Sequence, residues 1–314
     1  MDEVDLLYQE VILDHNKNPR NFGELDDATH QAVGHNPLCG DHVEIFLKVN
    51  DGKVEDVKFK GVGCAISKAS ASIMTTVLKG KTLDEVKDLF QRFHNVLTTD
   101  LFNQGLVTIQ DTSATLAALL ANPQPGQLIY DFCAAPGGKS FVFAEKMKNT
   151  GKIVAIDKYP SKLRFIEEGA KRLGLTNIEV RSGDALIIEF DNPADIVFLD
   201  VPCSGLGTIS RNPDIKWKRE REDIYKIAEV QKKILANATK SVKIGGAIIY
   251  STCTTEPEEN EQNIEWFLKN FPNFELDNAE NYLPEKVCEK GFLKTLPFKH
   301  YIDGAFAARL VRKR

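Results

Sequence analysis

Two cysteines follow two apolar segments in the second half of this chain. The first segment is ADIVFLDVPCSG, which contains Cys203, and the second is GGAIIYSTCT, which contains Cys253. A carboxylate, Asp200, precedes the first cysteine by three residues. Further upstream, LIYDFCAAPGGKS has the pattern of a strand that runs into a glycine-rich turn. A turn that binds a cofactor, with two thiols delivered by later strands, indicates a site for covalent chemistry.

Methylation of carbon 5 of a cytosine is one of the few reactions that use this set of groups. A thiolate that adds at carbon 6 makes carbon 5 nucleophilic enough to accept a methyl group. A carboxylic acid near ring nitrogen 3 assists, and a second helper is needed when the carbon-5 proton leaves and the thiolate is expelled. Cys203, Cys253 and Asp200 match these roles. The pKa of the reactive thiol must be lowered by a nearby helix N-terminus or cation, and Lys139 is a candidate for the cation.

The other cysteines of this half, Cys133 and Cys288, are interpreted as small buried side chains.

The turn DFCAAPGGKS does not fit the GxGxxG dinucleotide pattern, but it has similar physical properties. Its alanines are small, and its two glycines let the backbone approach a ligand closely and adopt positive φ. The helix that begins near its lysine offers free N–H groups to a carboxylate or phosphate. The predicted cofactor residues of this turn are Ala134, Pro136, Gly137, Gly138 and Lys139.

Acidic residues at strand ends complete the predicted cofactor site. Asp157 ends the strand after the turn, 20 residues beyond Gly137, where a carboxylate can hold ribose hydroxyls. Asp184 ends the third strand and is placed to bond an adenine amine. Asp200 is assigned to this site as well as to the reaction. A single Asp after a strand is usually a cap or turn residue, but three beside a glycine turn favour a binding site.

The two halves of the chain have different patterns, which predicts two domains, residues 1–99 and 100–314. In the first, a helix over residues 4–15 precedes two alternating strands joined by Asp51-Gly52, a strong hairpin signal. Two helices follow, the second opened by a capping box at Thr82 and Glu85. This is a small α+β unit. From about residue 100 strands alternate with helices, which predicts an α/β fold with an open, mostly parallel sheet.

Charge and composition narrow the class of protein. The net charge of −5 lies entirely in residues 1–99, because residues 100–314 carry equal numbers of basic and acidic side chains. Nucleic-acid binding therefore needs a local patch, and Arg211–Lys233 is either such a patch or a solvated helix face. The sequence has no run of apolar residues long enough for a membrane span, and its acidic start resembles no signal peptide. Six cysteines without a paired framework suit a reducing cytoplasm.

Residues 100–314 resemble the Fmu/Sun (RsmB-like) family of RNA 5-methylcytosine methyltransferases. The resemblance is carried by GLVTIQDTSATL, DFCAAPGGKS, SGDA, DVPCSGLGTISRNPDIKW, YSTCTTEPEENE and DGAFAARL. It implies a Rossmann-like class I fold, S-adenosyl-L-methionine as cofactor and rRNA or tRNA as substrate. It further implies Cys253 as the nucleophile, Cys203 as the group that aids product release, and Asp200 near the base. Two departures are Lys162, where the family usually has arginine, and Ala305, where it usually has an aromatic residue.

Residues 4–99 resemble a U-type (NifU/IscU/SufU-like) iron–sulfur cluster scaffold. The matching stretches are LYQEVILDHNKNPRNFG, NPLCGDHVEIFL and GVGCAISKASASIM. The resemblance implies that Cys39, Asp41 and Cys64 bind zinc or an iron–sulfur cluster, with a cysteine desulfurase as a partner. The third cysteine of such scaffolds has no counterpart here. The resemblance to such scaffolds implies an alternative function for the chain, iron–sulfur cluster assembly or zinc-dependent sulfur transfer.

Both resemblances are incomplete near residue 100, where the two halves of the chain join. A scaffold that lacks its C-terminal part precedes a methyltransferase that lacks its usual RNA-recognition segment. A gene fusion, a rearranged reading frame and an engineered chimera would each produce this arrangement.

Overall fold

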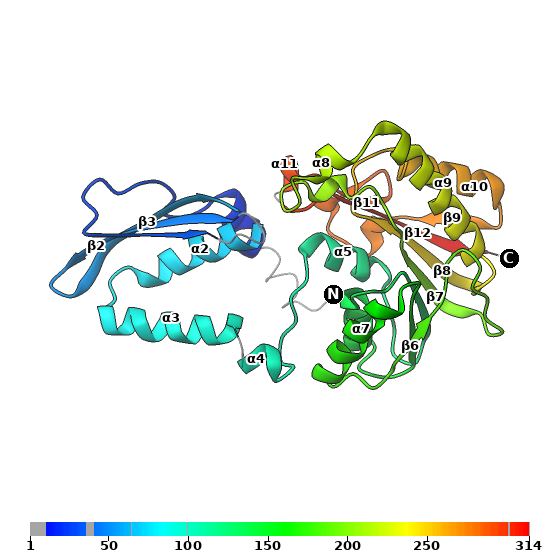
Figure 1. The fold of residues 1–314 in the computed structure, drawn as a ribbon, viewed down its shortest axis with the longest axis horizontal. Helices are drawn as coiled ribbons and strands as arrows, with labels where there is room; N and C mark the ends of the chain where they lie inside the picture. Colours follow the sequence, from blue (N-terminus) through cyan, green and yellow to red (C-terminus); the bar gives the residue numbers. More distant parts are fainter. Residues whose placement is uncertain (1–10, 36–40, 64, 99, 301, 314) are drawn as a thin grey trace. The chain divides into compact units, whose positions relative to one another are not determined.

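The fold is taken from a computed structural model that describes residues 11–35, 41–63, 65–98, 100–300 and 302–313. The chain divides into two compact units (Figure 1). The first is built mainly from residues up to Phe102 and the second mainly from residues after it. Within the described residues, no helix combines the length and the apolar content that a membrane crossing requires.

The first unit contains a three-stranded antiparallel sheet in the order β1-β2-β3. Its strands are β1 (His30–His35), β2 (His42–Asn50) and β3 (Lys53–Val62). The predicted Asp51-Gly52 turn is confirmed, since both residues adopt positive φ, 46° and 71°, between β2 and β3. Strand β1 was not predicted. All six of its residues are exposed, so it has no buried face whose alternation would reveal it.

Two helices accompany this sheet, α2 (Ala65–Leu78) and α3 (Leu83–Thr98). Val54 and Val57 of β3 pack with Leu78 of α2 in a small apolar core. The predicted capping box is confirmed, because Thr82 N donates to Glu85 Oε2 at 2.8 Å and Glu85 N donates to Thr82 Oγ1 at 3.2 Å. Of the predicted helix over 4–15, residues 11–15 are described and helical, and the helix continues to residue 17. Helix α4 (Asp100–Asn103) follows α3.

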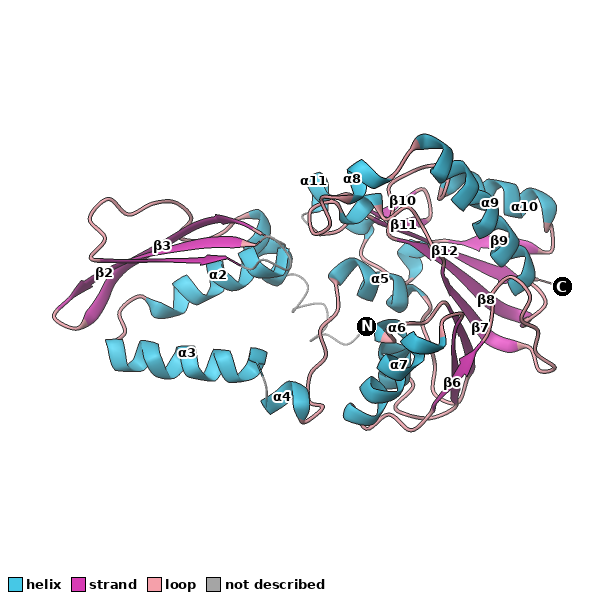
Figure 2. Cartoon of the chain, in the orientation of Figure 1, coloured by secondary structure: helices cyan, strands magenta, loops and turns pink. Residues whose placement is uncertain are grey.

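The second unit is built on a nine-stranded sheet in the order β10-β11-β12-β8-β7-β4-β5-β6, with β9 paired to β12 (Figure 2). Strands β6, β5, β4, β7 and β8 are mutually parallel. The predicted α/β class is therefore confirmed. The strands are β4 (Leu128–Phe132), β5 (Lys152–Asp157), β6 (Ile178–Ser182), β7 (Ala194–Asp200), β8 (Val242–Thr252), β9 (Phe274–Asp277), β10 (Cys288–Glu289), β11 (Phe292–Thr295) and β12 (Ala305–Arg312).

Helices cover both faces of this sheet (Figure 2). One side carries α5 (Thr112–Leu120), α6 (Gly138–Lys146) and α7 (Pro160–Arg172), and the other carries α9 (Arg221–Ala238) and α10 (Glu261–Asn270). The short helices α8 (Ile215–Lys218) and α11 (Pro297–His300) lie in connections. The parallel strands β4, β5 and β7 are largely buried on both faces, as their continuous apolar runs predict, whereas β6 at the edge of the sheet is largely exposed.

Candidate active site

The carboxyl ends of the parallel strands lie along one edge of the sheet and bring the predicted site residues together. Asp200 ends β7 and pairs in register with Ser251 of β8, so Cys203 and Cys253 both follow neighbouring strand ends. The glycine turn follows β4, and Asp157 ends β5. Ligands of open parallel sheets bind at this edge, which makes it the candidate site.

The glycine turn has a backbone that requires glycine at one position. Gly137 has φ of 109°, and a Cβ atom there would lie 2.7 Å from Cζ of Phe141. It is the residue before α6, so the first N–H groups of that helix face the site. Ala134 N donates to Ile156 O at 2.8 Å, which ties the turn to β5.

Two of the three predicted cofactor carboxylates, Asp157 and Asp184, are held by backbone donors. Asp157 accepts from Ala135 N at 3.2 Å and from Tyr159 N at 3.0 Å. Asp184 accepts from Leu186 N at 3.0 Å, and this bond, together with Lys158, lowers its pKa. Each carboxylate oxygen has further lone pairs, so both remain able to accept hydroxyl or amine donors.

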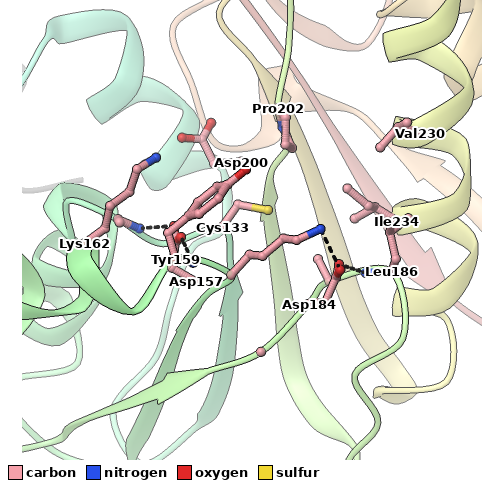
Figure 3. Close-up of a pocket in the computed structure, with 14 residues that line it drawn as sticks. Cys133, Asp157, Tyr159, Lys162, Asp184, Leu186, Asp200, Pro202, Val230 and Ile234 are labelled. Atoms are coloured by element: carbon pink, nitrogen blue, oxygen red, sulfur yellow. Dashed lines mark hydrogen bonds and ion pairs between the residues drawn. The ribbon is translucent and has the colours of Figure 1, made fainter.

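A cavity of about 440 Å³ opens between these carboxylates (Figure 3). Its lining combines three carboxylates, Asp157, Asp184 and Asp200, with a set of apolar side chains. Such a combination suits a nucleoside, whose ribose needs acceptors and whose base needs a flat apolar surface. The apolar side chains are those of Ala185, Leu186, Pro202, Val230 and Ile234.

A second cavity, of about 230 Å³, shares Ala135 and Asp200 with the first and lies against the glycine turn. Of the predicted cofactor residues, Ala134, Pro136, Gly138 and Lys139 line it together with Asp200, whereas Gly137 lines neither cavity. Sequence reasoning missed two further lining residues, and both carry buried polar atoms without a hydrogen-bond partner in the structure. They are Gln110 (Nε2 and Oε1) and Asp131 (Oδ1).

These unpaired atoms fit the amino-acid end of S-adenosyl-L-methionine, which offers both donors and acceptors. A buried polar atom without a partner is costly, so a ligand that supplies the missing bonds is stabilised there. The larger cavity, with its carboxylates and apolar side chains, suits the adenosine part. The donor set and the two joined cavities therefore accommodate this cofactor.

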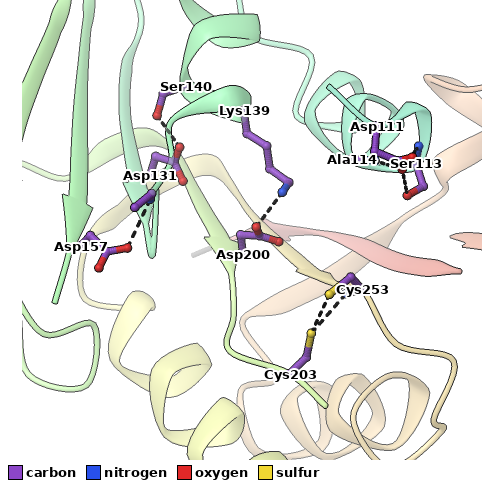
Figure 4. Close-up of polar contacts among 11 residues, drawn as sticks. Asp111, Ser113, Ala114, Asp131, Lys139, Ser140, Asp157, Asp200, Cys203 and Cys253 are labelled. Atoms are coloured by element: carbon purple, nitrogen blue, oxygen red, sulfur yellow. Dashed lines mark hydrogen bonds and ion pairs between the residues drawn. The ribbon is translucent and has the colours of Figure 1, made fainter. Parts of the chain in front are cut away.

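Lys139 and Asp200 form an ion pair between the cofactor turn and β7, with Nζ 2.6 Å from Oδ2 (Figure 4). Burial acts to lower the pKa of Lys139, but the Asp200 carboxylate outweighs it, and the pKa is raised. Lys139 therefore stays an ammonium at neutral pH, and it provides a fixed positive charge beside the strand ends.

Cys203 and Cys253 are in contact, with their Sγ atoms 3.1 Å apart (Figure 4). The hydrogen bond from Cys203 lowers the pKa of Cys253; the loss of surrounding water and the Asp200 carboxylate oppose it, and Lys139 adds to it. The same hydrogen bond, with burial, raises the pKa of Cys203. Cys253 is also the more exposed of the two. The pair thus divides into a more acidic thiol, Cys253, and a less acidic one, Cys203.

A buried hydrogen-bond network fixes the loops that carry these thiols, and sequence reasoning did not anticipate it. Ser204 Oγ lies 2.9 Å from Thr254 Oγ1, so the residues that follow the two cysteines are joined directly. Glu259 Oε2 accepts from Ser204 N at 2.9 Å and from Gln231 Nε2 at 2.8 Å. Gln231 Nε2 also donates to Pro202 O at 2.9 Å. The backbone on both sides of Cys203 is therefore anchored.

The cysteines interpreted as buried side chains are partly buried. Burial raises the pKa of Cys288 to about 11 and raises the pKa of Cys133 as well. Neither is a thiolate at neutral pH. Cys133 borders the larger cavity, but only as part of its wall.

The predicted metal ligands fall mostly outside the described residues, which include Asp41 but neither Cys39 nor Cys64. A Cβ atom on Gly63 would lie 3.0 Å from Asp41 Oδ1, so this carboxylate lies beside the residue that precedes Cys64. Across the part of the chain that is described, no three His, Cys, Asp or Glu side chains gather as a metal site.

The parallel sheet, the glycine turn after β4 and the acidic strand ends define a class I methyltransferase domain. Residues 118–311 match the family described as 16S rRNA methyltransferase RsmB/F. The chain belongs to this family. Residues 7–105 match the NifU-like N-terminal domain. Both resemblances noted from the sequence are thereby confirmed.

Curated relatives align with two thirds or more of this chain. The probable ribosomal RNA small subunit methyltransferase B of Synechocystis sp. is 36% identical over 266 residues, which are 83% of this chain and 59% of the relative. The Bacillus subtilis protein of the same description is 40% identical over 222 residues, 68% of this chain and 50% of the relative. The chain spans about half the length of the curated relatives it matches.

Solved structures agree with this relationship. NSun6 from Pyrococcus horikoshii superposes with a TM-score of 0.63 at 31% identity, over 69% of this chain and 56% of that one. A methyltransferase homolog protein from the same organism gives a TM-score of 0.61 at 29% identity, over 73% of this chain and 82% of that one.

Proposed function

We propose that the second unit is an S-adenosyl-L-methionine-dependent methyltransferase that modifies carbon 5 of a cytosine in RNA, with ribosomal RNA of the small subunit as the leading substrate. The observation that carries the proposal is the thiol pair, in which a hydrogen-bonded thiol lowers the pKa of its neighbour. The names of the relatives, ribosomal RNA small subunit methyltransferases, support the choice of RNA.

In this proposal Cys253 adds to carbon 6 of a cytosine turned out of its stack, because the thiolate must reach the face of the ring. Lys139, held by Asp200 at 2.6 Å, donates a hydrogen bond or a proton at ring nitrogen 3 as electrons move toward it. Asp200 orients that ammonium. The cofactor supplies an electrophilic methyl group for carbon 5.

Cys203 acts in the release step. A water molecule takes the carbon-5 proton, the electron pair of that C–H bond forms the double bond between carbons 5 and 6, and the bond between Cys253 and carbon 6 breaks as its electron pair returns to sulfur. The Cys203 thiol, 3.1 Å away, donates a hydrogen bond to that sulfur and stabilises the departing thiolate. For the cofactor, we assign Asp157 and Asp184 to the nucleoside, and Ala134, Pro136, Gly138 and Lys139 to the wall beside its amino-acid end.

Transfer of labelled methyl groups to unmodified RNA tests the proposal. Cys253→Ala should abolish transfer and leave cofactor affinity within about twofold, because Cys253 lines neither cavity. Cys203→Ala should instead accumulate a covalent protein–RNA adduct, visible as a band of lower mobility under denaturing conditions. Full activity of Cys253→Ala would exclude it as the nucleophile. If Cys203→Ala accumulates no adduct, Cys203 does not act in the release step.

For the first unit, we propose a second function, binding of zinc or an iron–sulfur cluster by Cys39, Asp41 and Cys64, with a cysteine desulfurase as the source of sulfur. The match to the NifU-like domain and the position of Asp41 beside Gly63 support it. Metal and sulfide analysis of the whole chain tests it. Metal that persists in Cys39→Ser and Cys64→Ser would overturn it.

We place the boundary between the two domains at residues 99 and 100.

A further inference from the structure

An exposed tryptophan stands beside the loop of the release cysteine. Trp217 lies on α8, and 81% of it is exposed, the largest exposed fraction among the described large apolar side chains. Nζ of Lys216 lies 5.0 Å from the centroid of its ring. A large apolar ring held in water costs free energy, so a ring this exposed, with a cation over one face, marks a surface that a flat partner can cover.

The surroundings of Trp217 are basic. Residues 214–221 contain four basic side chains, all exposed, against two acidic ones. One of the acidic residues, Asp214, is already paired with Lys218. Such a surface attracts a polyanion rather than another protein of mixed charge. The basic residues are Lys216, Lys218, Arg219 and Arg221.

The basic segment 214–221, called the patch below, is connected to the active site in two ways. Arg219 Nε donates to Ser204 O at 3.2 Å, one residue beyond Cys203. Helix α9 begins at Arg221, and two of its later residues, Val230 and Ile234, line the larger cavity. Nine residues of α-helix span about 14 Å, so the patch and the cofactor cavity lie within two or three nucleotides of each other.

We infer that Trp217 and its basic neighbours form a platform for single-stranded RNA, on which a base next to the target cytosine stacks while Lys216, Lys218 and Arg219 contact phosphates. The inference rests on the proposed function and deepens it, since it names where the strand beside the reacting base is held. Single-stranded rather than paired RNA is required because a stacked duplex leaves no free base face for the ring. A further aromatic ring, Tyr225, lies four residues after Arg221 on α9 and is 48% exposed, and it extends the platform along that helix.

The chain allows a direct optical test, because it contains only two tryptophans, Trp217 and Trp266. In the full-length Trp266→Phe protein all tryptophan fluorescence comes from Trp217. A single-stranded 12-nucleotide RNA with one cytosine among adenines should quench this fluorescence, and the same strand in a duplex should not. In Trp217→Phe, where only Trp266 emits, the RNA should cause no quenching.

Kinetics provide the second readout. Trp217→Ala should raise KM for the RNA about tenfold or more, the range seen when one stacking ring is removed, with kcat within twofold. Trp217→Phe, which keeps a ring, should recover most of the loss. The matched control is Phe165→Ala on α7, an aromatic that is 45% exposed and lies 4.9 Å from Arg164, and it should leave KM unchanged. Lys216→Ala should reduce the slope of log Kd against log salt by about 0.7.

The RNA platform at Trp217 and the proposed methyltransferase activity can be refuted independently of each other. Quenching of Trp217 without methyl transfer to any RNA would support the platform and overturn the proposed activity. Methyl transfer without quenching, or with the same KM in Trp217→Ala as in Phe165→Ala, would overturn the platform and leave the activity standing.

Discussion

Replacement of Glu259 by alanine tests whether the buried network holds the cysteine loops. Glu259 is fully buried, and its Oε2 accepts from Ser204 N and Gln231 Nε2. Its removal leaves two buried N–H groups without an acceptor, that of Ser204 and one of the two on Gln231 Nε2, whose other N–H keeps Pro202 O, and each costs about 1–3 kcal/mol. We therefore expect the free energy of unfolding to fall by about 2–6 kcal/mol.

Glu259→Gln is the matched control. Its amide oxygen can take the place of Oε2 and keep both bonds, while its NH₂ group takes the place of Oε1, which has no hydrogen-bond partner in the structure. The glutamine variant should lose less than half of what the alanine variant loses.

Urea unfolding followed by tryptophan fluorescence measures the effect on the second unit alone, because both tryptophans lie in it. With a slope of about 2 kcal/mol per molar urea, the midpoint of Glu259→Ala should fall by about 1–3 M. Equal midpoints for the alanine and glutamine variants, or a fall below about 0.5 M for alanine, would refute the argument that the two hydrogen bonds anchor the loop.

Two further changes probe the cofactor edge. Gly137→Ala should weaken S-adenosyl-L-methionine binding in calorimetry and destabilise the second unit by more than about 1 kcal/mol, since φ is 109° and the new Cβ would meet Phe141; unchanged affinity would contradict this. Burial raises the pKa of Asp131 from 3.8 to about 7, so the folded protein keeps a proton that the unfolded chain releases. The unfolding free energy should therefore fall as the pH rises from about 4 to about 7, and Asp131→Asn should flatten that decline in urea titrations at several pH values. An identical slope in both proteins would mean that Asp131 titrates normally.

Much of the catalytic edge was predictable because it depends on strand ends. An apolar run such as DIVFLDVP predicts a buried strand. Parallel strands bring their carboxyl ends together regardless of their distance in sequence. The meeting of Cys203 with Cys253 and of Lys139 with Asp200 follows from that rule. The resemblance to known families added the roles of these residues, which residue types alone leave open.

Other parts depend on tertiary burial, which no local pattern reveals. Gln231 and Glu259 lie on a mixed-charge helix and in a glutamate-rich loop, where a solvated position is the ordinary expectation. Both are fully buried because Tyr250, Asn263 and the Cys203 loop supply partners. The strands β9 to β11 are too short for an alternating pattern, and β1 has no buried face.

The register between β7 and β8 determines which changes of length the site can tolerate. The 49 residues that separate Cys203 from Cys253 include α8 and α9, and insertions in their connecting loops would leave both thiols where they are. Deletion of a single residue within β8 would instead turn Ser251 and the segment after it to the opposite face of the sheet. In natural or designed variants of this domain, changes of length should therefore be confined to the connecting loops outside residues 214–221, while the two strands keep a constant length.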